Sequence, residues 1–527
     1  MTTLTIKYVS YNQYRLFWAI VTVVATAILL NFGITINQGL ALLFSATVLT
    51  IWSRNRENGL IAAILFFMVK PLFVRIAYAS DSQFAAGAVS GGFDLLGITP
   101  ALLLAGLIVW HSFVRAARHE PLLKGRTRLL LGLFSIVAFL TIFNPANSLI
   151  VGLGGFERNV LPNMLIMLTA SFLFTSKESL TKITKALIIL GLISCVYGIG
   201  QYLLGLYPWE KSWILYVAFK ENTHGWLTIG LSGVEFRLFS IFYNYMDFTF
   251  CNVLIFLMAI SYGPGLSSKW QKWRYLYLIL WIVVLALSLE RMPMIMTMVG
   301  TGAVYLLRSS KAKRKKVLMI GTLATACFFV TLNLAEPLLK STDAHKFIRL
   351  AELTNPLSAD SISDRMNRKW RPAINTIAAN PLGVGIGFGS QTLANSTASK
   401  SNHWVEPHNE LLQKTLETGV IGGFIFLILL ISLFREGLKL GRTESSISSF
   451  GYGFAAGTIA FWLCGIVNVP FSGSSGLLYW TLAGAVIGGI KTSHCIKGTK
   501  NEQFYADKLS NVSAKEARAR ISEQKGS

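Results

Sequence analysis

Two arginines and one histidine in this sequence have the side chains and the surroundings that phosphate chemistry needs. Arg237 lies in GVEFRLFSIFYNYMDF, Arg291 in LALSLERMPMIM, and His408 in VEPHNELLQKTLETG. Arginine guanidinium groups match phosphate oxygens, and a neutral imidazole can accept a proton from an attacking hydroxyl. Each of the three residues stands beside an apolar run, so their substrate is predicted to lie in a membrane.

The chemistry that these residues favour is glycosyl transfer from a lipid carrier. A polyprenyl pyrophosphate keeps its lipid in the bilayer and its glycan outside, and its pyrophosphate is the leaving group. Arg237 and Arg291 are predicted to hold that pyrophosphate, and His408 to deprotonate the acceptor hydroxyl. The residues leave two alternatives open, an ion pair of Arg291 with Glu290 or a lipid phosphate, and a purely structural role for His408.

His408 is expected in the first turn of a helix. Pro407 suits a first helical position, because its missing N–H costs nothing there. Leu412, Leu416 and Gly419 then recur at helical spacing on the face that His408 would share. The helix dipole is expected to disfavour a proton on the imidazole and so to lower its pKa.

The elements that must position these residues are membrane helices. The chain of 527 residues is 53% hydrophobic and only 14% charged, whereas soluble domains carry about a quarter charged residues. Its apolar runs predict an all-α polytopic integral membrane protein, with about fourteen transmembrane helices and a large external helical loop. The expected span centres are near Val23, Ala46, Leu65, Ala105, Ile136, Met167, Leu190, Cys251, Ile282, Thr297, Ala324, Phe426, Ile459 and Ala483.

The basic residues predict the orientation. The net charge is +23, but the lysines and arginines form short clusters between spans, which argues against nucleic-acid binding and follows the positive-inside rule. The clusters lie at residues 54–56, 115–128, 177–185, 269–274, 308–316 and 435–442. With about fourteen spans they share one side with both termini. We therefore expect cytoplasmic termini and a site on the external face.

The chain is predicted to fall into five regions. They are 1–240 with the N-terminal spans and first external loop, 241–332 with the central spans and the Arg291 hairpin, 333–417 as an external loop subdomain, 418–491 with the C-terminal spans, and 492–527 as a cytoplasmic tail. Arg75 is expected to extend toward the headgroups, and Asp247 to pair with a cation. The alternating glycines of LGVGIGFGS are expected to form a close-approach turn near the site, because no strand–loop–helix unit surrounds them.

The sequence resembles the O-antigen ligase and polymerase superfamily of bacterial membrane glycosyltransferases. The resemblance rests on RLFSIFYNYMDFTFCN, on LSLERMPMIM, and on SDRMNRKWRPAINTIAANPLGVGIGFGS followed by EPHNELLQKTLETGVIGG. It implies that Arg237 and Arg291 bind the donor pyrophosphate and that His408 activates the acceptor. By the same resemblance, Arg365, Asn409 and Glu410 are candidate substrate-binding residues.

The resemblance also implies a reaction without metal or cofactor. Its partners would be an undecaprenyl-pyrophosphate-linked glycan donor, a glycan, lipid A core or protein acceptor, and membrane lipids. Glu290 departs from the family pattern, which usually has serine before the arginine. The alternative function is a polysaccharide or lipid-linked glycan transporter or flippase, but we find no convincing internal repeat in the sequence. The sugar, its linkage and the choice between ligase and polymerase stay open.

Overall fold

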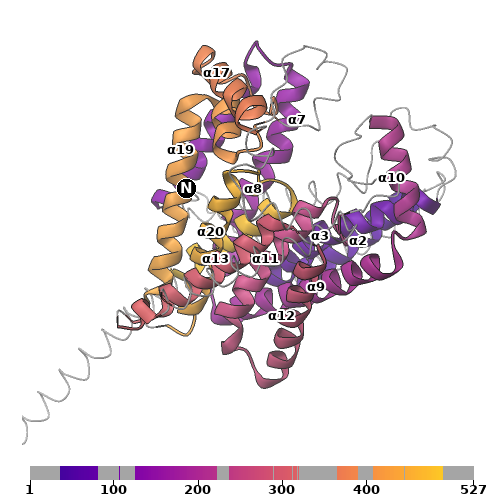
Figure 1. Ribbon diagram of the computed structural model, residues 1–527, viewed down its shortest axis with the longest axis vertical. Coiled ribbons are helices and arrows are strands. Elements are labelled where there is room, and N and C mark those ends of the chain that lie inside the picture. Colours follow the sequence, from indigo (N-terminus) through magenta and orange to yellow (C-terminus); the bar gives the residue numbers. More distant parts are fainter. Residues whose placement is uncertain are drawn as a thin grey trace, which may run out of the picture.

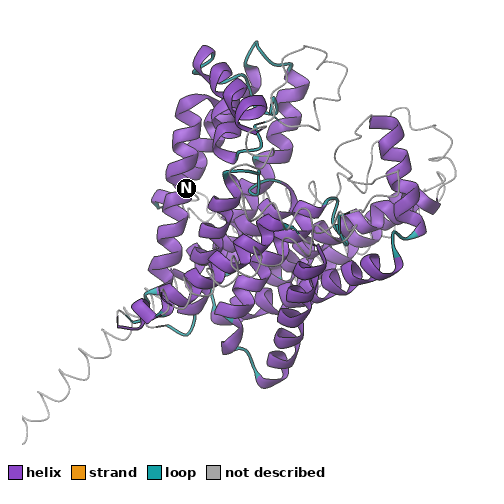
Figure 2. Ribbon diagram, viewed as in Figure 1, coloured by secondary structure: helices purple, strands orange, loops and turns teal. Residues whose placement is uncertain are grey.

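The computed structural model describes residues 36–80, 106, 125–221, 237–288, 290–310, 312–316, 319, 365–389, 407–443 and 445–490. The regular elements in these residues are all helices (Figure 2), so the predicted all-α class is confirmed for this part of the chain. The spans expected near Val23, Ala105 and Ala324, both termini and the tail 492–527 lie outside the described residues.

The helices of the described residues follow one another along the chain in a fixed order. They are α2 (Ile36–Arg54), α3 (Arg56–Ser80), α6 (Arg126–Leu140), η1 (Thr141–Phe143), α7 (Leu149–Asn159), α8 (Leu161–Leu173), α9 (Lys177–Leu204), α10 (Pro208–Glu221), α11 (Tyr245–Ser261), η2 (Gly263–Gly265), α12 (Ser268–Ser288), α13 (Arg291–Arg308), η3 (Arg365–Trp370), α17 (Arg371–Ala379), α19 (Glu410–Gly441), α20 (Ser448–Gly465) and a last helix, Gly473–Ile490.

Within the described residues, five stretches of helix are long and apolar enough to cross a membrane. They are Arg56–Ile76, Arg126–Phe143, Lys177–Leu204, Glu410–Gly441 and Gly473–Ile490, and Ala41–Arg54 and Tyr245–Ser261 are shorter apolar helices. Large apolar side chains such as Ile136, Ile193 and Phe424 are exposed on their outer faces, as expected where lipid replaces water. The chain is therefore a helical membrane protein, while the described helices do not establish the count of about fourteen spans.

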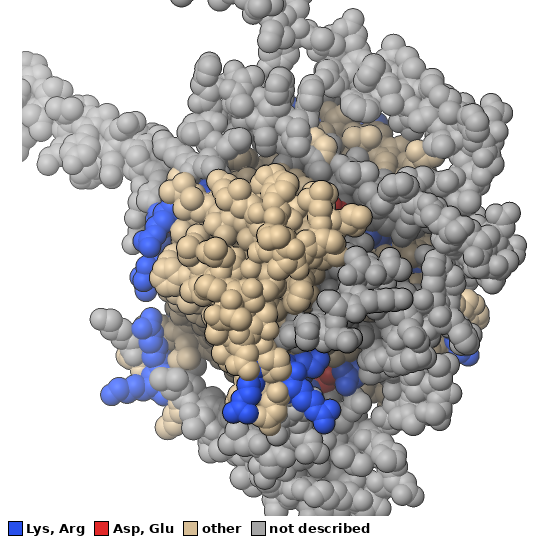
Figure 3. Space-filling model, turned by 90° about the horizontal axis from the view of Figure 1, so that it is seen from above, with Lys and Arg blue, Asp and Glu red and all other residues tan. Residues whose placement is uncertain are grey.

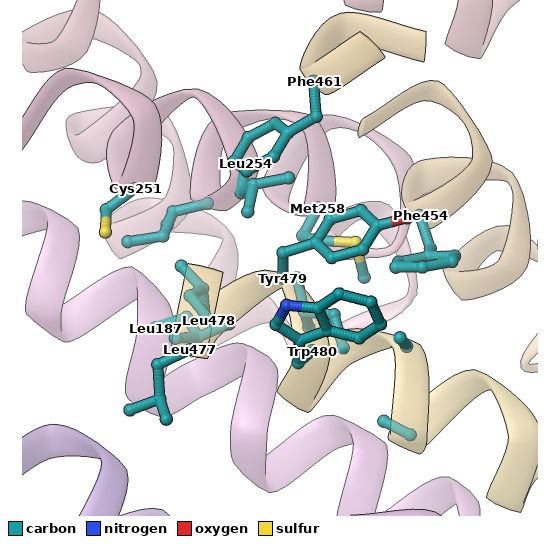
Figure 4. Packing of buried hydrophobic residues seen from close by; sticks show 14 of the residues in the cluster. Leu187, Cys251, Leu254, Met258, Phe454, Phe461, Leu477, Leu478, Tyr479 and Trp480 are labelled. Carbon is teal, nitrogen blue, oxygen red and sulfur yellow. The ribbon is translucent and has the colours of Figure 1, made fainter. Parts of the chain in front are cut away.

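Aromatic side chains fill the centre of the bundle, where α11, α20 and the last helix meet (Figure 4). The rings of Phe461 and Tyr479 stack with their centres 5.4 Å apart. α19 and α20 cross closely at Gly451, where a Cβ would lie only 2.5 Å from Gly441 N. Small residues allow this close backbone approach in membrane bundles.

Basic connections meet at one end of the bundle. Lys182 Nζ at the start of α9 lies 3.1 Å from Glu57 Oε2 at the start of α3. Arg308 at the end of α13 donates to Ser261 O at 3.0 Å, and Ser261 Oγ donates to Ser449 O at 2.6 Å. We call this part of the molecule the basic end. Figure 3 views the molecule from above, from the end opposite to the basic end, and lysine and arginine side chains border a broad uncharged area on the face that it shows.

The opposite end carries the elements around the predicted site. α17 packs against α19, and both lie with α7 near the top of the view in Figure 1, whereas α12 lies at the bottom. The predicted external subdomain, residues 333–417, contributes η3, α17 and the start of α19 within the described residues.

Candidate functional site

The motif that contains His408 leads directly into α19. The N-cap of this helix is Asn409, whose side chain accepts a hydrogen bond from the Leu412 N–H at 2.9 Å. α19 bends at Gly419, which has φ 75° and ψ 174°. The helix thus consists of a short arm, residues 410–418, and a longer apolar arm after the bend.

His408 lies before the N-cap and not in the first helical turn, so the expected position was wrong. Its backbone has φ 45°, in the left-handed region that residues other than glycine seldom adopt. Its side chain is half-buried, and its pKa is lowered to about 4 by burial and by the positive charges of Lys369 and Arg365. The direction of the shift is the expected one, but its causes are desolvation and neighbouring cations.

Two of the predicted residues donate hydrogen bonds to the segment between α20 and the last helix. We call residues 466–475 the bridging turn. Arg365 Nη1 donates to Val467 O at 3.1 Å, and Asn409 Nδ2 donates to Ile466 O at 2.9 Å. The carbonyl groups after α20 therefore hold η3 and the His408 segment at the same place.

Glu410 contacts the interior of the protein. Its side chain is almost fully buried, and its Oε2 accepts a hydrogen bond from Phe471 N–H in the bridging turn at 3.2 Å. Lys414 Nζ lies 3.5 Å from Glu410 Oε1 and 3.9 Å from Glu417 Oε2. The lysine offsets part of the charge of the two buried carboxylates, and the hydrogen bond from Phe471 N–H attaches the short arm of α19 to the bridging turn.

The alternating glycines pack against the bend of α19. Gly383 has φ 88°, and a Cβ on it would lie 2.4 Å from Gly419 N. The bend removes a helical partner from the Leu416 carbonyl, and Val384 N–H donates to it at 2.9 Å. The predicted close-approach turn is confirmed, and it stabilises the bend of α19.

Arg237 and Arg291 form a second group. Arg237 Nε lies 3.1 Å from Glu290 Oε1, and the guanidinium carbon lies 4.4 Å from the centre of the Tyr245 ring. The side chains of Arg237 and Glu290 are 24% and 16% exposed. Glu290 directly precedes Arg291, the first residue of α13. The segment of Arg237 therefore reaches the start of the helix that carries Arg291.

The bridging turn connects the two groups of residues. Asp247 in the first turn of α11 accepts a hydrogen bond from Ser475 N–H at 3.2 Å. Its own N–H donates at 2.7 Å to Asn244, the N-cap of α11. These described partners of Asp247 are neutral, whereas we expected a cation. One turn thus contacts Arg365 and Asn409 with its first residues and the start of α11 with its last.

Part of this arrangement lies in a stretch of the chain that matches a known protein family. Residues 276–427 match the family model described as O-antigen ligase. Over this range the chain is similar to the O-antigen ligase family. Arg291, Arg365 and His408 fall inside the matched range, whereas Arg237 lies before it. No curated protein matches the chain.

A buried ion pair that the sequence did not reveal supports the segment that follows Arg237. Arg75, which we expected at the headgroups, is fully buried and donates to Glu210 Oε1 at 3.1 Å and to Ser240 O at 2.7 Å. Ser240 has φ 52°, and its N–H donates to Gln201 Oε1 at 2.7 Å. The network fixes the backbone shortly after Arg237.

The chemical capacity of the site follows from its charges. It offers several cations and one neutral imidazole, so it can bind a polyanion and accept a proton. Within the described part of the chain, no group of three or more His, Cys, Asp or Glu side chains is placed to hold a metal ion. Cys195, Cys251 and Cys464 are buried free thiols.

Proposed function

We propose that the protein transfers a glycan from an undecaprenyl-pyrophosphate-linked donor to an acceptor hydroxyl. The observation that carries this proposal is the half-buried His408 next to Asn409, which shares the bridging turn with Arg365, inside the range that matches the O-antigen ligase model. Burial and the charges of Lys369 and Arg365 lower the pKa of His408 and favour its neutral form. A base next to cations suits a reaction in which a hydroxyl loses its proton while negative charge builds on a leaving phosphate.

Arg237 and Arg291 bind the donor pyrophosphate in this proposal. Guanidinium groups form strong charge-assisted hydrogen bonds with phosphate oxygens. Arg237 already contacts the carboxylate of Glu290 at 3.1 Å, which supports its ability to hold an anion. The apolar helices around the site let the lipid of the donor stay in the bilayer.

The reaction proceeds by displacement at the donor sugar. The acceptor oxygen forms a bond to the anomeric carbon, and the bond between that carbon and the pyrophosphate oxygen breaks. The lipid pyrophosphate leaves with the electron pair, and the acceptor proton passes to His408. Because Arg365 and Lys369 lower the pKa of His408, a bound pyrophosphate that offsets their charge raises this pKa and strengthens the base.

The other predicted residues support this centre. Arg365 is proposed to contact the donor phosphate with the guanidinium nitrogens that do not bond Val467 O. Asn409 is proposed to keep His408 in place through its bond to Ile466 O. The buried contacts of Glu410 favour a positioning role over substrate contact, because its carboxylate bonds Phe471 N–H.

We also propose that the protein lies in the bacterial inner membrane with the site on the periplasmic face. The contacts among the basic connections support this orientation, since basic residues between spans favour the cytoplasmic side. Both termini are proposed to be cytoplasmic.

Complementation in the native host tests the proposal. The gene is deleted and replaced by wild type, His408→Ala or His408→Asn, and surface glycans are separated on a gel. His408→Asn is the matched variant, because asparagine tolerates the left-handed backbone of residue 408 but cannot take the proton. Loss of a general base costs about 10²- to 10⁴-fold in rate, so we expect only wild type to restore the glycans.

The glycans that accumulate identify the reaction further. Full-length polymer left on the carrier indicates a ligase, and single repeat units indicate a polymerase. If His408→Asn restores the glycans as well as wild type does, His408 is not the base and a transporter becomes the better proposal.

A further inference from the structure

The carboxylate of Glu290 forms an ion pair with Arg237, the arginine that is proposed to bind the donor pyrophosphate. Glu290 Oε1 lies 3.1 Å from Arg237 Nε, and Arg237 Nε makes no well-aligned hydrogen bond. The contact is therefore an electrostatic ion pair. The two side chains are partly exposed, but the paired atoms themselves are buried, so a ligand that displaces Glu290 has to offset the charge of Arg237 in its place.

The side chain of Glu290 does not cap the helix that it precedes. Glu290 is the N-cap residue of α13, but its side chain makes no capping hydrogen bond. It lies in the short connection between α12, which ends at Ser288, and α13, which begins at Arg291.

The surroundings of Arg237 explain why a competing carboxylate is useful. Arg237 precedes α11, an apolar helix, and the ends of apolar helices lie at the level of lipid headgroups. Headgroup phosphodiesters carry a single negative charge and are abundant there. The pyrophosphate of a lipid-linked donor carries two, and the attraction to a cation grows with the charge of the anion.

We propose that Glu290 is a selectivity residue, which keeps singly charged lipid phosphates away from Arg237 and is displaced by the pyrophosphate of the lipid-linked donor. This inference rests on the proposed function. It uses a repulsive element against the wrong ligand, which is a common way to achieve specificity. Both ligands compete with the Glu290 carboxylate for the same guanidinium N–H groups, but the doubly charged ligand overcomes it more readily.

Binding of inorganic pyrophosphate to the full-length protein tests the inference. The protein is purified in neutral detergent, and the Kd for pyrophosphate is measured by titration calorimetry with and without phosphatidylglycerol in the micelles. In wild type, we expect phosphatidylglycerol to weaken pyrophosphate binding only slightly. In Glu290→Gln, we expect tighter pyrophosphate binding without this lipid, and an additional loss of about two- to five-fold when it is added.

Two control variants separate the inference from the proposed function. Glu57→Gln removes the glutamate of another ion pair, Glu57–Lys182 at 3.1 Å on the basic end, and is expected to behave like wild type. Arg237→Gln is expected to weaken pyrophosphate binding. If it does not, the proposed donor site is wrong. If Arg237→Gln weakens binding but Glu290→Gln responds to phosphatidylglycerol as wild type does, the donor site stands and the selectivity role of Glu290 is overturned.

Discussion

The proton on His408 determines the pH range of the proposed reaction. Its pKa in the folded protein is about 4, below the ordinary value near 6.5. A general base works in its neutral form, so activity is present above this pKa and is lost as the pH falls through it. We therefore expect the acidic limb of kcat/KM near pH 4, measured with a lipid-linked donor across a pH series.

Variants of Lys369 test the cause of that limb. Lys369→Gln removes one of the positive charges that lower the pKa of His408, so the limb should move to higher pH. Lys369→Arg keeps the charge and serves as the control. An acidic limb that stays in place in Lys369→Gln would show that the charge of Lys369 does not set the protonation of His408.

At the scale of the element, the bend of α19 depends on a conformation that glycine adopts readily. Gly419 has φ 75°, and a Cβ on it would lie 2.6 Å from Leu382 C. Gly419→Ala therefore combines backbone strain of about 1–3 kcal/mol, because this conformation is essentially restricted to glycine, with a clash against backbone. We expect a lower unfolding temperature in detergent and loss of glycan transfer.

The matched control for Gly419 is Gly302→Ala in α13. A Cβ on Gly302 meets no atom within 4 Å, and alanine favours a helix over glycine by about 1 kcal/mol. This variant should unfold at the same or a higher temperature. Equal destabilisation by both substitutions would contradict the special role of the bend.

The pair of Arg75 and Glu210 connects α3 to α10. Removing one partner of a buried ion pair costs about 3–5 kcal/mol, so Arg75→Met should lower the unfolding temperature strongly. Because Ser240 O also loses its donor, the KM for the donor should rise. Arg75→Met combined with Glu210→Gln leaves no uncompensated charge and should recover part of the stability. A double variant as unstable as the sum of the single ones would argue against this coupling.

The positions of the membrane helices along the chain could be predicted best from the sequence. Apolar runs centred near Leu65, Leu190 and Phe426 coincide with helices that are long enough to cross a membrane. These runs are local and long, so composition alone indicates them. The start of α19 was less predictable, because Pro407 as a first helical residue competes with the cap that Asn409 makes.

The contacts of the site depend on residues far apart in the chain. Arg75 meets Glu210 across 135 positions, and the bend of α19 is held by the N–H of Val384. Neither partner is visible in local sequence patterns. The bridging turn contains neither a histidine nor an arginine, so reasoning from reactive side chains passed over it, although its backbone groups connect the two groups of predicted residues.

At the scale of the whole molecule, the ion pairs and hydrogen bonds fall into two groups, one at each end of the bundle. The basic end joins the starts of α3 and α9 through Glu57 and Lys182. The other end joins Arg365 and Asn409 to the bridging turn. Net positive charge between spans favours the cytoplasm. We therefore expect the basic end to face the cytoplasm and the other end to face the outside.

Cysteine labelling measures this expectation in spheroplasts. Leu382 is 75% exposed near the bend of α19, and Lys272 is exposed near the start of α12, close to the basic end. Leu382→Cys should react with a membrane-impermeant maleimide in intact spheroplasts, whereas Lys272→Cys should react only after permeabilisation. The unsubstituted chain reports the background from its own cysteines. The reverse pattern would place the site on the cytoplasmic face, where a donor with an exported glycan could not reach His408, and the transfer reaction proposed for this protein would have to be abandoned.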